Sequence, residues 1–494
     1  MKISISYPPL ESKKGIPLLT QNRQFQWFNA PTYIYPVIPA FAATLLKSRG
    51  HEVFWDDAIA EGLSYTTWKK RIVEQKPDII ALETKTPVVK MHWKIIDEIR
   101  KELPEAKIVL MGDHVTALPE ESLQNCQVDY VIASGDYDFM LLNLADYLEG
   151  KADLEGGFYY RCHSREDGSP DILNSGPSDL SKHNLDTLPM IDRELTQWEN
   201  YAYKNGNFKY TPGAYMMSGR DCWWGRCTFC SWTTFFPGKN FRTRSAEKAL
   251  DEVGHLIDLG VREIMEDSGS LPVGKWLEEF CDGMIERGYN KKVTMSCNMR
   301  ITGIRRPEVW RKMKQAGFRF ILFGLESANQ ETLDRIDKNL KVEDIEPGLR
   351  RCKEAGLEPH ITAMIGYPWE TKEQAQKTID LAKDLFKKGY VDTLQGTIVI
   401  PYPGTPLYKE CQQNGWLKTE DYEDFDQRQM VMKSPLTSAD AKELVQGLYK
   451  SFLTPKFILR KILSIRSLDD LKFIAMAGFK VLGHLADFSK KKDL

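Results

Sequence analysis

The stretch Ser218–Trp232, SGRDCWWGRCTFCSW, holds three of the chain's nine cysteines within nine residues. These residues, Cys222, Cys227 and Cys230, follow an apolar run that predicts a strand, so we expect them on a loop at its carboxyl end. The other six cysteines stand singly along the chain. Clustered cysteines on one loop indicate metal ligation, and they mark the sheet edge where we expect chemistry.

Three thiolates suit an iron–sulfur cluster that takes three ligands from protein and leaves one iron open. The open iron can chelate the amino and carboxylate groups of a small molecule. Structural zinc is the main alternative, but it usually needs four protein ligands. The other candidates, His255, Cys281 and Cys297, do not stand at zinc-like spacing. A redox-sensing thiol group is a further alternative.

Strand and helix patterns alternate around the cysteine loop. Six apolar runs with helix-period stretches between them predict a full or partial (β/α)6 barrel of the TIM type over residues 211–418. In such barrels the chemistry lies at the carboxyl ends of the strands. The predicted strands are Ala214–Ser218, Arg262–Glu266, Val293–Cys297, Phe320–Gly324, Pro359–Met364 and Thr393–Val399.

Residues 1–150 alternate in the same way and predict an α/β, doubly wound, Rossmann-like parallel sheet, which binds ligands beyond the carboxyl ends of its strands. Residues 151–210 are richer in Gly, Pro, Asp, Ser and Asn, and we interpret them as a connector with a small hairpin at Phe158–Asp171. Residues 419–494 are predicted to be mostly helical.

The tail is basic and partly amphipathic. Residues 455–494 hold nine Lys or Arg against four Asp, and the stretch from Phe473 to Leu482 has an apolar face. The simpler interpretation is a cap packed on the barrel. The alternative is contact with a membrane surface.

The bulk composition is that of a soluble globular protein, with 494 residues, 42% hydrophobic residues and a net charge of -2. Nothing in this charge favours nucleic-acid binding. No apolar run is long enough for a membrane-spanning helix, and the first residues lack a secretory signal. We therefore expect a cytoplasmic protein with reduced cysteines, peripheral at a membrane if the tail binds one.

The cysteine loop resembles the cluster loop of radical S-adenosylmethionine (SAM) enzymes. The usual spacing there is C-x3-C-x2-C, whereas this chain has C-x4-C-x2-C. Its Trp-Trp-Gly-Arg insert resembles a variant of the cobalamin-binding members of that superfamily. The resemblance implies a 4Fe–4S cluster on the three cysteines.

Further segments resemble this family in the expected order, each at a predicted strand end. They include Gly324–Ser327, similar to a "GxES" segment, Gly366–Thr371, similar to "GxPxET", and Pro401–Thr405, similar to "PxPGT". The resemblance implies that SAM is bound by Phe229, Glu266, Asp267, Ser268, Arg300, Glu326, Ser327 and Gly366.

The segments Pro36–Asp56 and Val109–Asp138 resemble the cobalamin-binding domain that precedes the barrel in one class of these enzymes. The resemblance implies cobalamin contacts from Thr84, Gly112, His114, Thr116, Ser134 and Gly135. The chain lacks the D-x-H-x-x-G signature, so His114 is predicted to contact a corrin amide or to anchor its loop rather than to ligate cobalt. The alternative is a nucleotide-type or vestigial domain that binds nothing.

C-methylation of an unactivated carbon by SAM radical chemistry and cobalamin is the leading functional hypothesis. One alternative is a radical cyclase or rearrangement enzyme resembling the anaerobic magnesium-protoporphyrin ester cyclase. Another is a non-catalytic cobalamin or iron–sulfur sensor. The expected partners are a small-molecule substrate, such as a lipid or tetrapyrrole, and a ferredoxin or flavodoxin as electron donor.

Overall fold

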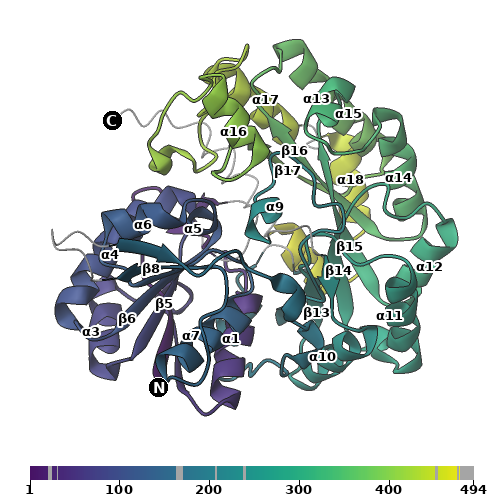
Figure 1. The fold of residues 1–494 in the computed structure, drawn as a ribbon. Coiled ribbons are helices and arrows are strands. Elements are labelled where there is room, and N and C mark those ends of the chain that lie inside the picture. The colour runs from purple at the N-terminus through teal and green to yellow at the C-terminus, as the bar shows by residue number, and fades with distance from the viewer. Residues whose placement is uncertain are drawn as a thin grey trace.

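Two parallel sheets organise the chain (Figure 1). The computed structural model describes residues 1–19, 25–29, 32–162, 171–205, 208–236, 241–450, 454–475 and 478. The first sheet belongs to the N-terminal part of the chain and the second to the part that carries the cysteine loop. The alternating α/β architecture predicted from the sequence is therefore present in both parts.

The first sheet has the strand order β4-β1-β5-β6-β7-β8-β9. Its first five strands are parallel, and β8 and β9 add an antiparallel edge. The chain therefore reverses its winding direction between β1 and β5, which is where doubly wound sheets bind ligands. The strands are β1 (Lys2–Tyr7), β4 (Glu52–Asp57), β5 (Ile79–Glu83), β6 (Lys107–Met111), β7 (Tyr130–Ile132), β8 (Phe158–Cys162) and β9 (Asp171–Asn174).

Helices cover both faces of this sheet. The helix α1 is apolar almost throughout and packs against α7 on one face, while α3 and α4 contact each other on the other face. The helices are α1 (Val37–Ser48), α2 (Ala58–Glu61), α3 (Tyr65–Gln75), α4 (Val89–Glu102), α5 (Asp113–Ala117), α6 (Pro119–Asn125) and α7 (Tyr137–Leu148). The predicted hairpin is the β8–β9 pair, so the first sheet extends to Asn174; its connection, residues 163–170, lies outside the described residues.

The second sheet is a six-stranded parallel sheet in sequence order, β10-β13-β14-β15-β16-β17. Among the described residues β10 and β17 do not pair, so the sheet forms a partial barrel. The strands are β10 (Gly213–Met216), β13 (Glu263–Glu266), β14 (Thr294–Met299), β15 (Phe318–Glu326), β16 (Glu358–Ile365) and β17 (Thr393–Ile398).

Several outer helices of the barrel begin at a residue whose side chain caps them. In α15, Thr371 and Gln374 form a reciprocal capping box, and Gly389 ends the helix in the left-handed conformation. The helices are α10 (Ala246–Asp258), α11 (Lys275–Glu286), α12 (Pro307–Gln315), α13 (Gln330–Arg335), α14 (Val342–Glu354), α15 (Lys372–Lys388) and α16 (Pro406–Gln413).

The short helix α9 (Trp232–Phe235), which follows the last cysteine of the loop, lies between the two sheets (Figure 1). It contacts α5 of the N-terminal part. A Cβ added to Gly404, in the loop after β17, would meet Thr234 of α9 and Ala117 of α5. Three distant parts of the chain therefore meet beside the cysteine loop.

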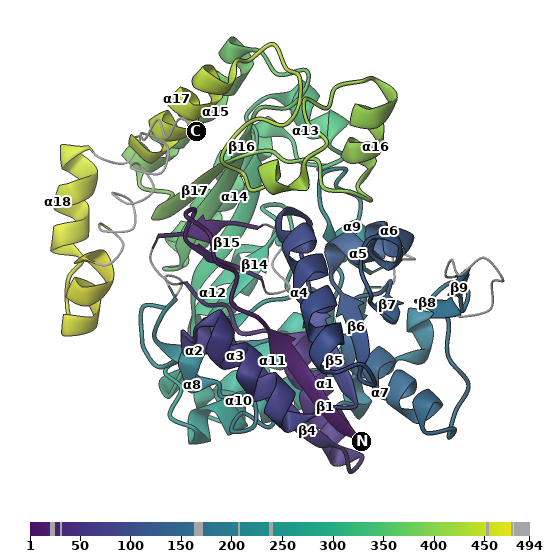
Figure 2. The same ribbon diagram turned by 90° about the vertical axis from the view of Figure 1, so that its left-hand side faces the viewer.

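The C-terminal region contains α17 (Ser438–Lys450), which packs on β17, and α18 (Pro455–Leu463) on the outer side of the barrel (Figure 2). Residues 419–437 have one 3-10 turn, η5 (Tyr422–Asp424), and a bridge from Leu417 to Met432 instead of the predicted helix. Most of the amphipathic stretch from Phe473 to Leu482 lies outside the described residues. Within the part that the structure describes, every helix is too short or too polar to cross a bilayer.

Candidate functional site

The cysteine loop leaves the barrel through two short strands, β11 (Gly219–Arg220) and β12 (Arg242–Thr243), which pair antiparallel. Asp221 adopts a left-handed φ of 70°, and its carboxylate accepts a hydrogen bond of 2.6 Å from the backbone N–H of Cys222. Gly225 is also left-handed, with φ 56°. These two residues turn the loop so that its three cysteines, all half-buried, stand at the carboxyl edge of the barrel.

The backbone of the loop is fixed to later barrel segments. The N–H of Thr228 donates to the carbonyl of Ile336 at 3.0 Å, and the N–H of Leu407 donates to the carbonyl of Thr228 at 2.9 Å. The indole N–H of Trp224 donates to the carbonyl of Asp337 at 2.7 Å. These bonds join the middle of the loop, from Trp224 to Thr228, to the barrel.

Among the described residues, the cysteine loop does not form a set of three ligand atoms as close as those of a preformed zinc site. Two thiolates on one tetrahedral zinc ion lie about 3.8 Å apart, given Zn–S bonds of about 2.3 Å. Within the described residues, the one set of three His, Cys, Asp or Glu ligands that lie within 4.8 Å of one another is His51, Asp146 and Glu149, far from this loop in the sequence. The three cysteine sulfurs therefore do not all lie within 4.8 Å of one another.

Cationic side chains surround the loop. Burial raises the pKa of the Cys227 thiol, whereas the nearby Lys338 and Arg300 oppose that rise. The ammonium of Lys338 pairs with Glu326 at 2.7 Å. The guanidinium of Arg300 stacks on Trp224, 4.6 Å from the ring centroid, and donates to the carbonyl of Lys338. This edge of the barrel therefore suits an anionic ligand.

Lys338 was not predicted from the sequence, because it lies in the connection between α13 and α14 rather than at a strand end. Arg300 and Glu326 were predicted as SAM contacts, and the structure brings both close to Cys227. Glu326 has a left-handed φ of 64°, an uncommon conformation for a residue with a side chain. The ion pair with Lys338 holds its carboxylate.

The acidic segment after β13 has structural partners. Glu266 is fully buried, which raises its pKa to about 7, and it accepts a hydrogen bond of 2.8 Å from the N–H of Ser218. The hydroxyl of Ser268 accepts from the N–H of Gly219 at 2.8 Å. Both side chains thus bind the backbone at Ser218 and Gly219, where the cysteine loop begins. Asp267 is half-buried and accepts from the amide of Asn298 at 2.9 Å.

The remaining predicted SAM contacts lie at the same edge. Phe229 is half-buried and packs on the core, and the hydroxyl of Ser327 accepts from the N–H of Asn329. Gly366 has a φ of 102°, and its N–H donates to Glu370 at 2.7 Å. The second carboxylate oxygen of Glu370 is buried without a hydrogen-bond partner, and burial raises its pKa to about 7.

At the carboxyl edge of the first sheet, the predicted hydroxyls are engaged locally. Thr84 bonds the ring of His92 at 2.8 Å, Thr116 donates to the carbonyl of Gly112 at 2.7 Å, and Ser134 accepts from the N–H of Asp136. Gly112 is required by the fold, because a Cβ there would lie 2.0 Å from the carbonyl oxygen of Thr84.

His114 is a buried loop anchor. Its Nδ1 lies 3.2 Å from the hydroxyl of Thr86, and its Nε2 lies 2.9 Å from a carboxylate oxygen of Glu121. The ring also packs edge-on against Tyr422, with centroids 4.8 Å apart. Because both ring nitrogens have partners, this arrangement favours the anchoring role over cobalt ligation.

Some buried side-chain oxygens at the same edge have no hydrogen-bond partner among the described residues. One carboxylate oxygen of Glu83, one of Asp113 and the hydroxyl of Tyr137 are buried without hydrogen bonds. Burial raises the pKa of Glu83 to about 7, although Lys85 opposes the rise. Unpaired buried polar atoms are costly, so their grouping at a ligand-binding edge indicates a ligand with hydrogen-bonding groups. Glu83 and Asp113 stand at predicted strand ends, but the sequence did not single them out as ligand contacts.

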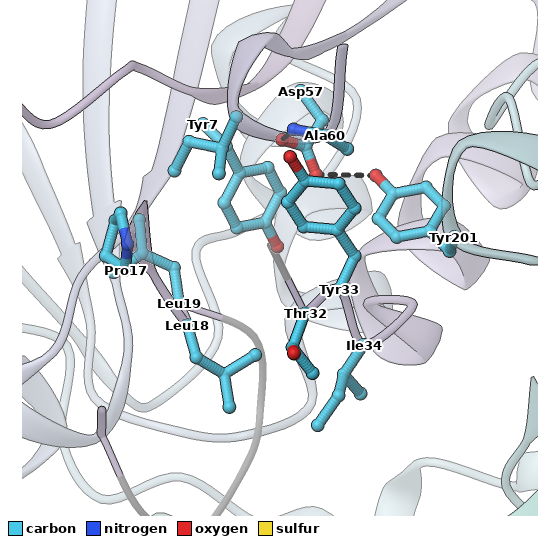
Figure 3. Close-up of a pocket in the computed structure, with 11 residues that line it drawn as sticks. Tyr7, Pro17, Leu18, Leu19, Thr32, Tyr33, Ile34, Asp57, Ala60 and Tyr201 are labelled. Atoms are coloured by element: carbon cyan, nitrogen blue, oxygen red, sulfur yellow. Dashed lines mark hydrogen bonds between the residues drawn. The ribbon is translucent and has the colours of Figure 1, made fainter. Parts of the chain in front are cut away.

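A pocket opens beside this edge, between β1, β4 and the connector (Figure 3). Tyr7, Tyr33 and Tyr201 line it together with Asp57 and the apolar Leu18 and Leu19. The hydroxyl of Tyr201 donates to Asp57 at 2.5 Å, and that of Tyr7 donates to Glu83 at 2.6 Å. Burial raises the pKa of Asp57 to about 6.

Comparison with known proteins agrees with this geometry. Residues 216–382 match the model of the radical SAM superfamily. The chain carries a radical SAM domain. That match confirms the interpretation of the cysteine loop as part of a radical SAM enzyme.

Similar proteins extend the likeness beyond the barrel. An uncharacterised methyltransferase of Pyrococcus horikoshii is 27% identical over 445 residues, which are 86% of this chain and 90% of that protein. The anaerobic magnesium-protoporphyrin IX monomethyl ester cyclase of Cereibacter sphaeroides is 25% identical, over 85% of this chain and 67% of that enzyme.

The whole architecture has a counterpart among solved structures. The cobalamin-dependent SAM radical enzyme OxsB, solved with aqua-cobalamin and SAM bound, superimposes with a TM-score of 0.71 at 15% identity. The match covers 98% of this chain and 71% of that one. The predicted arrangement, a Rossmann-like domain before a radical SAM barrel, is therefore confirmed as a fold.

Proposed function

We propose that this protein methylates an unactivated carbon of an apolar small molecule, using a 4Fe–4S cluster, SAM and cobalamin. The observation that carries the proposal is the three-cysteine loop at the carboxyl edge of a radical SAM barrel, facing a second ligand-binding edge across α9. When bound, the reduced cluster and SAM supply a 5′-deoxyadenosyl radical, and cobalamin supplies the methyl group.

The residues of this chain have the tasks of binding and aiming. Cys222, Cys227 and Cys230 hold the cluster, and Lys338 and Arg300 balance the negative charge of thiolates and of the SAM carboxylate. Of the remaining predicted SAM contacts, Phe229 would contact the adenine, and Asp267 and Glu326 would hold the amino group. Four other predicted contacts would shape the site through hydrogen bonds within the protein: Glu266, Ser268, Ser327 and Gly366.

Cobalamin binds at the carboxyl edge of the first sheet. Its amide groups would satisfy the unpaired oxygens of Glu83 and Asp113. Gly112 and Gly135 would shape the edge by letting Thr84 and Phe235 pack against it. Thr84, His114, Thr116 and Ser134 fix the loops around it rather than bonding cobalt. The proposed domains are 1–150 for cobalamin, 151–210 as connector, 211–418 for the barrel and 419–494 as the C-terminal region.

The substrate class is a lipid or a tetrapyrrole, and a ferredoxin or flavodoxin supplies the electron. The likeness to the anaerobic cyclase favours one competing function, a radical cyclisation of a tetrapyrrole. Mass analysis separates the two reactions, because methylation adds one CH2 unit whereas oxidative cyclisation removes hydrogen or adds oxygen.

The first test is anaerobic reconstitution with iron, sulfide and hydroxocobalamin, followed by reduction and addition of SAM. We expect release of 5′-deoxyadenosine, transfer of a labelled methyl group from SAM to a tetrapyrrole or lipid fraction, and loss of both in the triple variant Cys222→Ala, Cys227→Ala, Cys230→Ala. Deoxyadenosine release by the triple variant contradicts the assignment, and absence of SAM cleavage in the wild type favours the sensor.

Contact with an anionic membrane surface is also part of this proposal. The apolar side chains of Leu459, Ile462 and Leu463 on α18 and of Leu468 after it are more than half exposed. Residues 455–494 carry nine cations and four anions, a net +5 in a chain of net -2, so the other residues carry -7. An exposed apolar face on a basic segment fits an anionic bilayer.

Sedimentation with vesicles tests the membrane contact. We expect binding to phosphatidylglycerol vesicles that weakens with salt and is lost in Leu459→Asp/Leu463→Asp. The matched control, Leu173→Asp, changes an exposed leucine of β9, on the side of the molecule opposite α18 (Figure 2). Equal binding by the double variant, or by neutral phosphatidylcholine alone, contradicts the contact.

A further inference from the structure

Arg220, two residues before the first cysteine of the loop, is buried against two carboxylates of the N-terminal domain. Its guanidinium donates to Asp136 at 2.9 Å and to one oxygen of Asp138 at 2.8 Å, with a further bond to the second oxygen of Asp138. Both aspartates are fully buried; Asp136 precedes α7 and Asp138 lies in its first turn. The start of the cluster loop is therefore fixed to the other domain.

Two more cations complete this arrangement. Arg242 lies opposite Arg220 in the β11–β12 pair and donates to both oxygens of Asp136, at 2.9 and 2.6 Å. His183, from the connector, lies 2.8 Å from Asp136 through its Nδ1. We call these five residues, Asp136, Asp138, His183, Arg220 and Arg242, the interdomain clamp.

The same N-terminal loop also touches the far end of the cysteine loop. A Cβ added to Gly135 would lie 2.5 Å from the ring of Phe235 and 2.6 Å from that of Phe236. Those rings follow Cys230 and pack on each other, with centroids 4.8 Å apart. The loop Ser134–Asp138 therefore contacts the cysteine loop both before its first cysteine and after its last.

This geometry means that the conformation of the cysteine loop and that of the loop Ser134–Asp138 depend on each other. An arginine that bonds two carboxylates through parallel N–H groups has little freedom to shift, and separating a buried pair is costly. A ligand that orders the cysteine loop therefore also orders Ser134–Asp138, so a second ligand at that loop has less conformational entropy to lose.

We propose that the interdomain clamp couples the two cofactor sites, so that loading the cluster on the cysteine loop tightens corrin binding at Ser134–Asp138. Arg220 is a positioning residue in this scheme, since it acts through the two loops that it joins. The inference rests on the proposed function, because it takes both cofactors as ligands. It goes beyond that function by naming the residues through which occupancy of the cluster site changes the affinity of the corrin site.

The test compares the Kd of hydroxocobalamin for the full-length chain with and without the reconstituted cluster, measured by equilibrium dialysis. We expect the cluster to tighten binding about five-fold or more in the wild type, in the range of ordinary site-to-site coupling. The ratio should fall to near one in Arg220→Gln and Asp138→Asn, and Arg220→Lys should keep an intermediate value. Arg226→Gln, which changes an exposed arginine of the same loop, should keep the wild-type ratio.

A wild-type ratio near one, or an unchanged ratio in Arg220→Gln and Asp138→Asn, overturns the coupling while leaving the proposed function standing. If neither variant folds, Arg242→Gln decides, because Arg242 is more exposed and bonds only Asp136 of the two carboxylates. It should lower the ratio, and an unchanged ratio overturns the inference. Absence of any cluster or cobalamin binding in the wild type instead contradicts the proposed function.

Discussion

The carboxyl edges of the two parallel sheets differ in charge. At the barrel edge, Arg300 and Lys338 surround the thiol of Cys227. At the edge of the first sheet, Glu83 and Asp113 each have one buried carboxylate oxygen without a hydrogen-bond partner, and Lys85 pairs with Asp113. One fold principle thus provides two sites, a cationic one suited to thiolates and a carboxylate, and an acidic one suited to hydrogen-bond donors such as amides.

The largest expected effect is a loss of activity at the barrel edge that leaves cobalamin binding at the other edge unchanged. Cys230→Ala removes one of three thiolate ligands, and we expect deoxyadenosine formation to fall by about 100-fold or more, since the chemistry depends on the cluster. Binding of hydroxocobalamin by the cluster-free variant should match that of cluster-free wild type. Cys162→Ala, at the end of β8, is the control. Full activity of the Cys230 variant would contradict the ligand assignment.

A substitution at the other edge should act on stability. Gly112→Ala places a Cβ 2.0 Å from the Thr84 carbonyl oxygen at a φ of 135°. We expect it to lower the free energy of unfolding by about 2–4 kcal/mol, as backbone strain and a clash combine. Gly150→Ala, also left-handed but with no neighbour within 4 Å, should cost about 1 kcal/mol in urea unfolding. Equal costs would show that Gly112 is not held by this contact.

A change to the cationic edge should affect SAM more than stability. Lys338→Met keeps the volume and removes the charge beside Cys227, and we expect SAM to bind about ten-fold more weakly, a typical loss for one charged hydrogen bond. Because the substitution also leaves Glu326 unpaired, Lys338→Met/Glu326→Gln is measured beside it. Lys341→Met, an exposed lysine nearby, is the control. Unchanged SAM affinity in both variants would contradict the role of Lys338.

The smallest effect concerns the clamp between the edges. Burial opposes protonation of His183, but hydrogen bonds to Asp136 and Glu155 raise its pKa from 6.5 to about 9. A raised pKa means that the stabilising contribution is complete below pH 6.5 and is lost as the pH rises through 9. We expect protonated His183 to contribute about 1–2 kcal/mol to the free energy of unfolding, a value reduced to allow for solvent screening. Urea unfolding at pH 6 and pH 9.5 should show this extra loss in wild type and not in His183→Gln.

The fold was predictable because its signals are local. Buried parallel strands appear as short apolar runs, and helix-period stretches such as Lys372–Lys388 separate them. The three cysteines were predictable for the same reason, since they stand within one loop. The extension of the first sheet by β9 was less visible, because an edge strand with exposed side chains lacks an apolar run.

The rest of the site depends on contacts between distant residues. Lys338 reaches the cysteine loop from more than a hundred positions away, and Arg220 meets Asp138 across 82 positions. The sequence also could not reveal that the hydroxyls of Thr116 and Ser134 are engaged by their own backbone. Strand-end residues were found by pattern, but which of them remain available to a ligand is decided by tertiary packing.

The most direct test of the account is pulsed electron–nuclear double resonance on the reduced, anaerobically reconstituted full-length chain with SAM labelled with 15N at its amino group. If the three cysteines hold a cluster with one open iron, the cluster signal will show hyperfine coupling to that nitrogen. A cluster signal that is the same with and without labelled SAM, or a protein that takes up zinc instead of iron, would contradict the account.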